Sequence, residues 1–303
     1  MKKFVKTLRE NFIFFLMVLP GAAWLILFFY IPVLGNVVAF KDYHITGEGF
    51  IDSVMKSKWV GFDNFKFLFS SKDAYIITRN TVLYNLAFIF LGLIVSVGIA
   101  IIFSEMRSKR LVKVFQTSML FPYFLSWVII SFFTDAFLNV DKGLINHILT
   151  SLGMKGINFY TEVAIWPALL LFLGIWKGFG YSSVMYYATI MGIDPTFYEA
   201  ATVDGASKWQ IFKGITFPML TPNHFFVFMM LTINSFKTFD LIFVLTEGGP
   251  GTATTLLSTY IYDQSFSYMR FGMASAASMI LFLIVGTITV VMFRMEKKFS
   301  DYM

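Results

Sequence analysis

Two apolar stretches of this 303-residue chain carry polar and aromatic side chains whose spacing suits ligand binding. Residues 163–190 contain Trp176, Lys177, Gly178 and Tyr181, and residues 223–245 contain Asn234, Lys237, Thr238 and Asp240. Gly178 and Tyr181 share a helix face at a spacing of three, as do Asn234 and Thr238 at a spacing of four. Polar groups within apolar helices mark functional sites, so these residues predict a binding path. Lys237 and Asp240 are expected to neutralise each other, and Lys177 to extend toward a polar boundary.

Three further residues are weaker candidates for the same path: Tyr123, Trp127 and Asp135. Aromatic residues near helix ends usually anchor a helix at the membrane interface. We therefore assign the predicted binding path to the residues of 163–190 and 223–245 named above.

Catalytic and metal chemistry find no support in the sequence. Cysteine is absent, and His44, His147 and His224 are far apart and fit no metal-ligand spacing. No glycine-rich segment supplies the lysine and hydroxyl of a Walker A loop. Asp135 and Asp240 lie on different stretches with no supporting histidine. We expect no catalytic residue, no metal and no cofactor bound by this chain.

The composition indicates a membrane protein. Hydrophobic residues make up 57% of the chain and charged residues 14%, compared with about 25% charged in soluble domains. Runs such as FIFFLMVL do not alternate, which argues against a β-barrel. Six stretches are long enough to cross a bilayer as helices, namely 12–40, 80–103, 114–138, 163–190, 223–245 and 271–293. The sequence therefore predicts an all-α integral membrane protein, whose first stretch continues through Trp24 to Tyr30 as an uncleaved anchor.

The basic residues set the expected topology. They concentrate in segments 1–11, 104–113, 191–222 and 294–303, whereas those in 41–79, 139–162 and 246–270 are nearly balanced by acidic residues. The positive-inside rule then places the first group, with both termini, in the cytoplasm and the second group outside. The net charge of +6 is explained by topology and anionic lipid rather than by nucleic acid.

Segment 191–222 is expected to be cytoplasmic. Its sequence predicts two short helices joined by a turn. Asp194 can cap the first, with Pro195 at its first helical position. Gly205 would end it in a left-handed conformation, and Ser207 with Gln210 forms a capping box for the second. Thr221 and Pro222 repeat the start signal for the next stretch.

Two interpretations of this hairpin stay open on its local chemistry. Phe197, Ala200, Ala201 and Asp204 share one face of the first helix, and Trp209, Phe212 and Lys213 one face of the second, so both could receive a neighbouring protein. Alternatively, the hairpin packs against its own bundle and Glu199 completes a capping box with Thr196.

The run EAATVDGASKWQIFKGITFPMLTP (199–222) resembles the EAA loop of permease subunits of binding-protein-dependent ABC importers. Phe217 departs from the usual leucine. LTEGGPGTATTLLSTYIY (245–262), whose Gly248–Gly251 predicts an outer turn, resembles sugar-importer permeases. YIPVLGNVVAFKDY (30–43) and WVGFDNFKFLF (59–69) resemble a subgroup for oligosaccharides derived from complex polysaccharides.

This resemblance implies the type I importer permease fold with six transmembrane helices, in a bacterial cytoplasmic membrane. It implies a second, usually non-identical permease subunit, two ATPase subunits that bind ATP-Mg, and an extracytoplasmic sugar-binding protein. The hairpin would couple to the ATPase through Glu199, Ala200, Ala201, Asp204, Gly205, Ala206, Trp209 and Phe212. Trp176 and Tyr181 would stack on an oligosaccharide, Asn234 and Thr238 would bind its hydroxyls, and Gly178 would admit it to the backbone.

A six-span secondary transporter or channel for a small polar solute is the alternative. Such a protein would show an inverted repeat or a charged relay in mid-membrane, and neither is found in the sequence.

Overall fold

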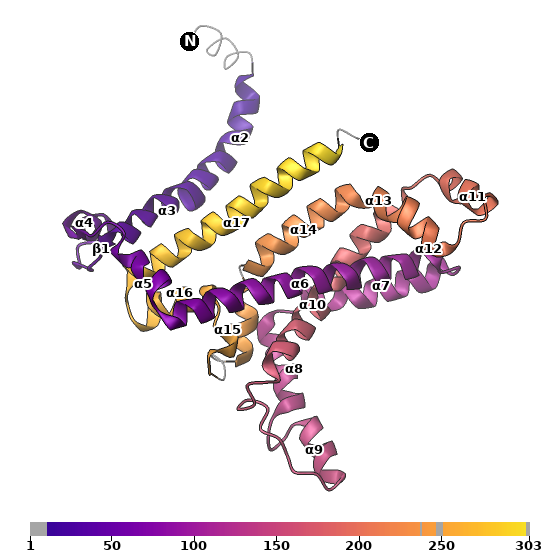
Figure 1. The fold of residues 1–303 in the computed structure, drawn as a ribbon. Helices are drawn as coiled ribbons and strands as arrows, with labels where there is room; N and C mark the ends of the chain where they lie inside the picture. Colours follow the sequence, from indigo (N-terminus) through magenta and orange to yellow (C-terminus); the bar gives the residue numbers. More distant parts are fainter. Residues whose placement is uncertain (1–10, 237, 247–250, 301–303) are drawn as a thin grey trace. The chain divides into compact units, whose positions relative to one another are not determined.

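The computed structural model describes residues 11–236, 238–246 and 251–300, and most of them are helical (Figure 1). They form two compact units, one of residues up to Ser70 with Asp263–Met279, the other of Ser71–Tyr262 with residues from Ile280 onward. α17 (Phe271–Ser300) begins in the first unit and continues into the second.

The first unit combines one long apolar helical run with a small folded segment. The run has α2 (Phe12–Leu25), η1 (Ile26–Tyr30), α3 (Ile31–Leu34) and η2 (Gly35–Phe40). The segment has β1 (Lys41–Asp42), α4 (Phe50–Lys56), β2 (Lys58–Trp59), η3 (Asp63–Phe65) and α5 (Lys66–Ser70), and η6 (Asp263–Ser267) leads into α17. The α2 and α3 side chains are largely exposed and apolar all round, as expected of a helix that meets lipid or another chain.

The two sequence motifs of the first unit fold against each other. β1 and β2 are antiparallel, with Lys41 opposite Trp59, and the Phe40 and Trp59 rings stack at 5.8 Å between centroids. The Asn64 amide donates to the Ala39 and Lys41 carbonyls, both at 2.9 Å. Motifs recognised separately in the sequence are therefore one structural element at the end of the first apolar run.

The second unit is a helical bundle. Its elements are α6 (Lys72–Glu105), α7 (Lys109–Phe124), α8 (Trp127–Leu138), α9 (Leu144–Ser151), α10 (Trp166–Met191), α11 (Pro195–Val203), α12 (Lys208–Ile211), η4 (Phe212–Thr216), α13 (Phe217–Met219), α14 (Thr221–Phe236), α15 (Asp240–Thr246), η5 (Gly251–Thr254) and α16 (Leu257–Tyr262). α10 packs along α6 and α7, and α14 packs along α6 (Figure 1).

Two buried clusters hold this bundle together. In one, Trp166 and Leu170 of α10 meet Leu241 of α15. In the other, Tyr186 of α10 meets Leu220 at the start of α14. Each cluster joins α10 to the α14–α15 region, so α10 is the central helix of the unit.

Polar residues of α6 fasten the segment that precedes α16. The Asn80 amide donates to the Thr252 carbonyl at 2.8 Å, and the Tyr84 hydroxyl donates to the Ala253 carbonyl at 3.3 Å. The Leu257 N–H in turn donates to the Thr81 hydroxyl at 2.9 Å. These bonds satisfy backbone groups that would otherwise be unpaired beside an apolar helix.

Within the described residues, four helices are long and apolar enough to cross a membrane, or five if a sharply bent pair counts as one span. The four are Phe12–Phe40, Asp73–Glu105, Trp166–Met191 and Phe271–Lys298. The prediction of continuous helices over 114–138 and 223–245 was wrong. The first divides into α7 and α8, which meet at 99°, and the second divides into α14 and α15.

Several helices extend beyond the predicted spans. α6 begins eight residues before residue 80, because Ser71 caps it by accepting a hydrogen bond from the Ala74 N–H at 3.0 Å. The expected loop 104–113 shortens to residues 106–108, because Ser108 caps α7. Segments 41–79 and 139–162, which were predicted to be extracytoplasmic, contain the helices α4 and α9.

Gly180 lies where the backbones of α10 and α7 approach closely, so this position should require glycine. A Cβ at Gly180 would overlap the Met119 carbonyl of α7, whereas one at Gly178 would meet nothing within 4 Å. Gly180→Ala should therefore destabilise the purified protein by about 1–3 kcal/mol, the usual cost of overpacking. Gly178→Ala, on the same helix, is the matched control. Equal apparent Tm values for both variants and the parent protein would contradict a close backbone contact at Gly180.

Candidate functional site

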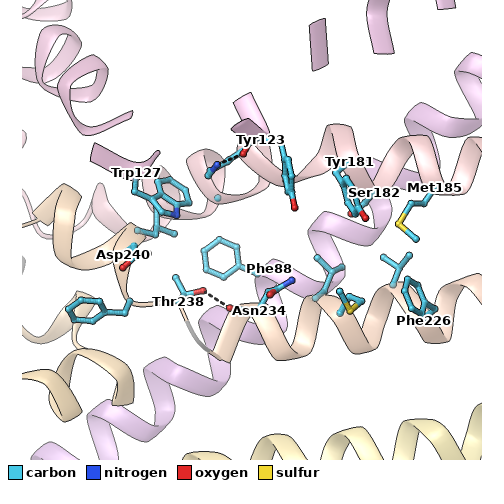
Figure 2. A pocket seen from close by; sticks show the side chains of 18 residues that line it. Phe88, Tyr123, Trp127, Tyr181, Ser182, Met185, Phe226, Asn234, Thr238 and Asp240 are labelled. Atoms are coloured by element: carbon cyan, nitrogen blue, oxygen red, sulfur yellow. Dashed lines mark hydrogen bonds between the residues drawn. The ribbon is translucent and has the colours of Figure 1, made fainter. Parts of the chain in front are cut away.

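The two interrupted helices meet at one pocket in the second unit (Figure 2). Its volume is about 420 Å³. Tyr123 and Trp127 flank the α7–α8 break, Thr238 and Phe239 belong to the α14–α15 break, and Asp240 begins α15. The remaining wall comes from α6, α10 and α14, with Phe88, Gly174, Lys177, Gly178, Tyr181, Ser182, Met185, Phe226, Val227, Met230, Leu231 and Asn234, and from Leu241 of α15.

The local sequence explains the α7–α8 break. Pro122 lies in the last turn of α7, where its missing N–H removes one hydrogen bond to the preceding turn and weakens the helix near its end. Ser126 then starts α8, because its hydroxyl accepts a hydrogen bond from the Ile129 N–H at 3.3 Å. α8 packs against α15, so the portions beyond the two breaks lie together.

Lys177 of α10 lies against the end of α7. Its ammonium donates to the carbonyls of Pro122, Tyr123 and Leu125 at 3.3, 2.7 and 2.6 Å. It also lies 5.6 Å from the ring centroids of both Tyr123 and Trp127. The lysine thus points onto backbone oxygens at the end of α7, and its extension toward a polar boundary stays a prediction.

The structure brings most of the predicted path together. Gly178, Tyr181, Asn234, Thr238 and Asp240 all line the pocket. Thr238 and Asn234 are also joined by a hydrogen bond from the Thr238 hydroxyl to the Asn234 carbonyl at 3.4 Å (Figure 2). Tyr181 stacks on Tyr123 at 4.9 Å between centroids.

Two of the sequence candidates lie elsewhere. Trp176 faces a separate apolar groove of about 520 Å³ between α8 and α10, because it is one residue away from the pocket-facing side of α10. Asp135 accepts hydrogen bonds from Asn139 at 3.1 Å and Tyr160 at 3.4 Å and does not line the pocket. Lys237, and with it the expected pairing with Asp240, lies outside the described residues.

The sequence analysis gave the residues beside the α7–α8 break too small a part in the binding path. Tyr123 and Trp127 were expected to be interface anchors, yet both line the pocket. The available signal was Pro122 followed four residues later by Ser126 at the start of an apolar run, which together predict a helix end and a new cap. Phe88, Ser182 and Met185 carried no such signal.

The hairpin follows its capping signals closely. The Asp194 carboxylate accepts a hydrogen bond from the Thr196 N–H at 2.9 Å, with Pro195 at the first helical position. Gly205 has a φ of +74°. The Ala206 N–H donates to the Ala201 carbonyl at 2.9 Å and the Gly205 N–H to the Thr202 carbonyl at 3.1 Å, which together form a Schellman motif. Ser207 and Gln210 form the predicted capping box.

The two helices of the hairpin differ in what they expose. Glu199, Ala200, Asp204 and Gly205 are exposed, Ala201 and Ala206 are half-buried, and Val203 and Trp209 are 86% and 68% exposed. Phe212 is half-buried: it packs against the Tyr186 and Leu220 cluster, and its ring centroid also lies 5.3 Å from that of Trp209. No described residue bonds to the Glu199 side chain, and Thr196 lies inside α11 rather than at its cap, which removes the capping interpretation of Glu199.

A charged contact joins the hairpin to α6. Lys208 of α12 pairs with Glu105 at the end of α6 at 2.6 Å. The pair is exposed, so it orients the helix more than it stabilises the fold. Together with Ile193, Tyr198 and Phe212, it borders a cavity of about 640 Å³ beneath the hairpin.

The pocket is suited to binding rather than to catalysis. Its polar groups are hydroxyls, one amide, the carboxylate of Asp240 and the ammonium of Lys177, set among aromatic rings. The described residues hold no cluster of three or more histidine, cysteine or acidic side chains that could bind a metal. Such a site can stack on and hydrogen-bond a polar ligand.

Comparisons with known proteins agree on one family. The model of the family described as binding-protein-dependent transport system inner membrane component matches residues 89–299. The polygalacturonan/rhamnogalacturonan transport system permease protein YteP of Bacillus subtilis (strain 168) is 30% identical, with 98% of this chain and 91% of the relative covered.

Solved structures give the same picture. A chain of a bacterial ABC transporter involved in the import of the acidic polysaccharide alginate superposes with a TM-score of 0.86 at 27% identity, covering 98% of this chain and 99% of that one. A second structure is that of the bacterial alginate transporter in complex with an alginate pentasaccharide-bound periplasmic protein. It gives a TM-score of 0.84 at 28% identity, covering 97% and 96%.

The Asp194 cap predicts a pH dependence at the start of α11. The hydrogen bonds from the Thr196 backbone and side chain lower the pKa of this carboxyl. The stabilisation of the start of α11 by this cap is therefore fully present above the carboxyl's unfolded pKa of about 3.9. It is lost as the pH falls through the lower pKa of the folded state. After correction for intrinsic rates, amide exchange at Thr196 and Phe197 should be independent of pH at neutral values and accelerate severalfold in strong acid.

Asp194→Asn, which keeps the acceptor oxygen, should lose this acid response, and Asp194→Ala should exchange faster at every pH. Identical exchange in all three proteins would contradict the cap.

Proposed function

Because the chain belongs to the family of binding-protein-dependent transport system inner membrane components, we infer that it is the permease subunit of an ABC sugar importer. It is a multi-pass protein of the bacterial inner membrane. A secondary transporter or channel is no longer a suitable alternative, since the family transports its substrates with a separate binding protein.

We propose that the chain crosses the membrane six times. α7 with α8 and α14 with α15 would each count as one interrupted span, added to the four continuous ones. Both termini and the hairpin would then be cytoplasmic. The basic residues of 1–11, 104–113, 191–222 and 294–303 support this orientation.

The pocket at the two breaks would form the sugar pathway. The observation that carries this proposal is that aromatic and hydrogen-bonding side chains from both sides of the hairpin line one cavity where two helices are interrupted. Interrupted helices at membrane depth are found where backbone lines a cavity or a substrate site. Tyr181 would stack on the sugar, Asn234 and Thr238 would bind its hydroxyls, and Gly178 would allow its close approach.

We propose an oligosaccharide as the substrate. The relatives are named for polygalacturonan and for alginate, both of which are polysaccharides. The pocket volume of about 420 Å³ lies within the usual range for small-molecule sites. It would hold part of a longer chain at a time.

The proposed partners are supported by the family and by a similar solved structure. An extracytoplasmic binding protein would deliver the sugar, as the structure with a pentasaccharide-bound periplasmic protein suggests. A second, non-identical permease subunit would complete the pathway. Two ATPase subunits would bind ATP-Mg, and this chain would bind no cofactor of its own.

The exposed face of the hairpin would dock on an ATPase subunit. Glu199, Ala200, Asp204 and Trp209 are open to a partner, while Gly205, Ala201 and Ala206 set the turn between the two helices. Phe212 would anchor the second helix to the bundle by packing against the cluster that contains Tyr186 and Leu220. ATP-driven closure would then shift the pathway between inward-open and outward-open states by differential binding.

The pathway is tested by uptake in proteoliposomes that contain the complete importer. Asn234→Ala and Tyr181→Ala should each lower the oligosaccharide uptake rate by about tenfold, the effect of losing one good hydrogen bond or ring contact. Trp176→Phe, on the same helix but facing the separate groove, should leave uptake unchanged. Wild-type uptake by both pocket variants, in complexes that assemble normally, would exclude these residues from the pathway.

The coupling role is tested at the turn. Gly205→Asp should insert and co-purify with its partner permease but lose transport-coupled ATPase stimulation, because a charged side chain would project from the exposed tip of the hairpin. Gly205→Asn, which also tolerates a positive φ, should retain more stimulation. Gly214→Asp, at an exposed glycine of the same hairpin, is the position control. A fully coupled Gly205→Asp complex would rule out docking through this turn.

A further inference from the structure

The end of α7 leaves a set of backbone oxygens without helical partners. The last four carbonyls of any helix lack intrahelical donors, and α7 ends at Phe124, beside a pocket whose wall is largely aromatic and aliphatic. An unpaired carbonyl in an apolar setting is costly, and in a bilayer no water is at hand to satisfy it. A break at this place therefore requires donors from elsewhere in the protein.

Lys177 supplies those donors. An ammonium has three N–H groups, and three carbonyls of the break, those of Pro122, Tyr123 and Leu125, lie within 3.3 Å of Nζ. The Pro122 carbonyl also accepts a hydrogen bond from the Leu125 N–H at 3.2 Å, so the ammonium matters most for Tyr123 and Leu125. The positive charge also meets the negative end of the α7 dipole. With its donors directed at backbone oxygens, the ammonium has none left for a saccharide, although the side chain borders the pocket.

The same ammonium holds the aromatic rings on either side of the break. Tyr123 and Trp127 both place their ring centroids 5.6 Å from Nζ, a distance at which cation–π attraction operates. One turn further along α10, Tyr181 stacks on Tyr123. Both break-side rings on the pocket wall are thus oriented by groups on α10 (Figure 2).

We propose that Lys177 is a positioning residue: it closes the carbonyl end of α7 and thereby fixes Tyr123 and Trp127 on the wall of the sugar pathway. The inference rests on the proposed function of the pocket. The charge of Lys177 acts on transport through the backbone and the two rings, without contact with the sugar.

The absence of cysteine from the chain allows a test by chemical replacement after assembly. Lys177→Cys would carry the single thiol of this subunit, in importer complexes whose partner subunits are also free of cysteine. An aminoethyl methanethiosulfonate reagent adds an ammonium close to the length of lysine. The propyl reagent adds a neutral group of the same length.

Uptake by the Lys177→Cys complex should fall by about tenfold or more, as expected when a charge-assisted hydrogen bond is lost. The aminoethyl reagent should restore most of the rate and the propyl reagent should not. A role in packing alone would be restored by both reagents. Equal restoration by both, or wild-type uptake before modification, would overturn the proposal.

If Lys177→Cys does not assemble, Lys177→Arg and Lys177→Met decide the question. Assembly and uptake by the arginine variant but not by the methionine variant would support a donating cation, and equal behaviour of the two would contradict it. The Asn234→Ala and Tyr181→Ala complexes separate this test from that of the pocket. Their failure to affect uptake would remove the pathway itself, whereas a negative Lys177 result beside impaired pocket variants would leave the pathway in place.

Discussion

The supply of hydrogen-bond partners to backbone groups away from water governs this structure. A continuous helix satisfies its own backbone, but each interruption leaves orphan groups that the protein must satisfy. At the α7–α8 break, Ser126 accepts from the new helix and Lys177 donates to the old one. Near α16, Asn80 and Thr81 do the same for the segment from 252 to 257. Some polar side chains of the bundle thus satisfy irregular backbone, and the pocket forms at such a place.

The hairpin, which follows the C-terminal end of α10, likewise provides partners for its backbone groups. Asp194, the Schellman turn at Gly205 and the Ser207–Gln210 box satisfy the exposed helix ends with local partners. Because these caps are local, the hairpin keeps its shape without burying much apolar surface. Its exposed valine and tryptophan are therefore free for another protein. Exposed apolar side chains gathered on one element are typical of surfaces that bind another protein.

Local signals made the hairpin predictable, and the lack of local signals limited the prediction of the pocket. Caps depend on residues two to four positions apart, so Asp194, Gly205 and Ser207 could be assigned from the sequence. Helix periodicity likewise brought Tyr181, Asn234 and Thr238 to one site. The directions of the Trp176 and Lys177 side chains depend on contacts between α10 and helices about fifty residues away. Hydropathy alone also reads an interrupted span as a continuous one, which hid the two breaks.

The tight approach at Gly180 has a mechanical consequence. Backbone touches backbone there between α10 and Met119 of α7, and one turn away on α10 Lys177 grips the end of α7. Two attachments this close together restrict how far α7 can slide or rotate against α10. α7 and α10 therefore form one packed pair, with the hairpin following the C-terminal end of α10 and the rings of the break beside its middle.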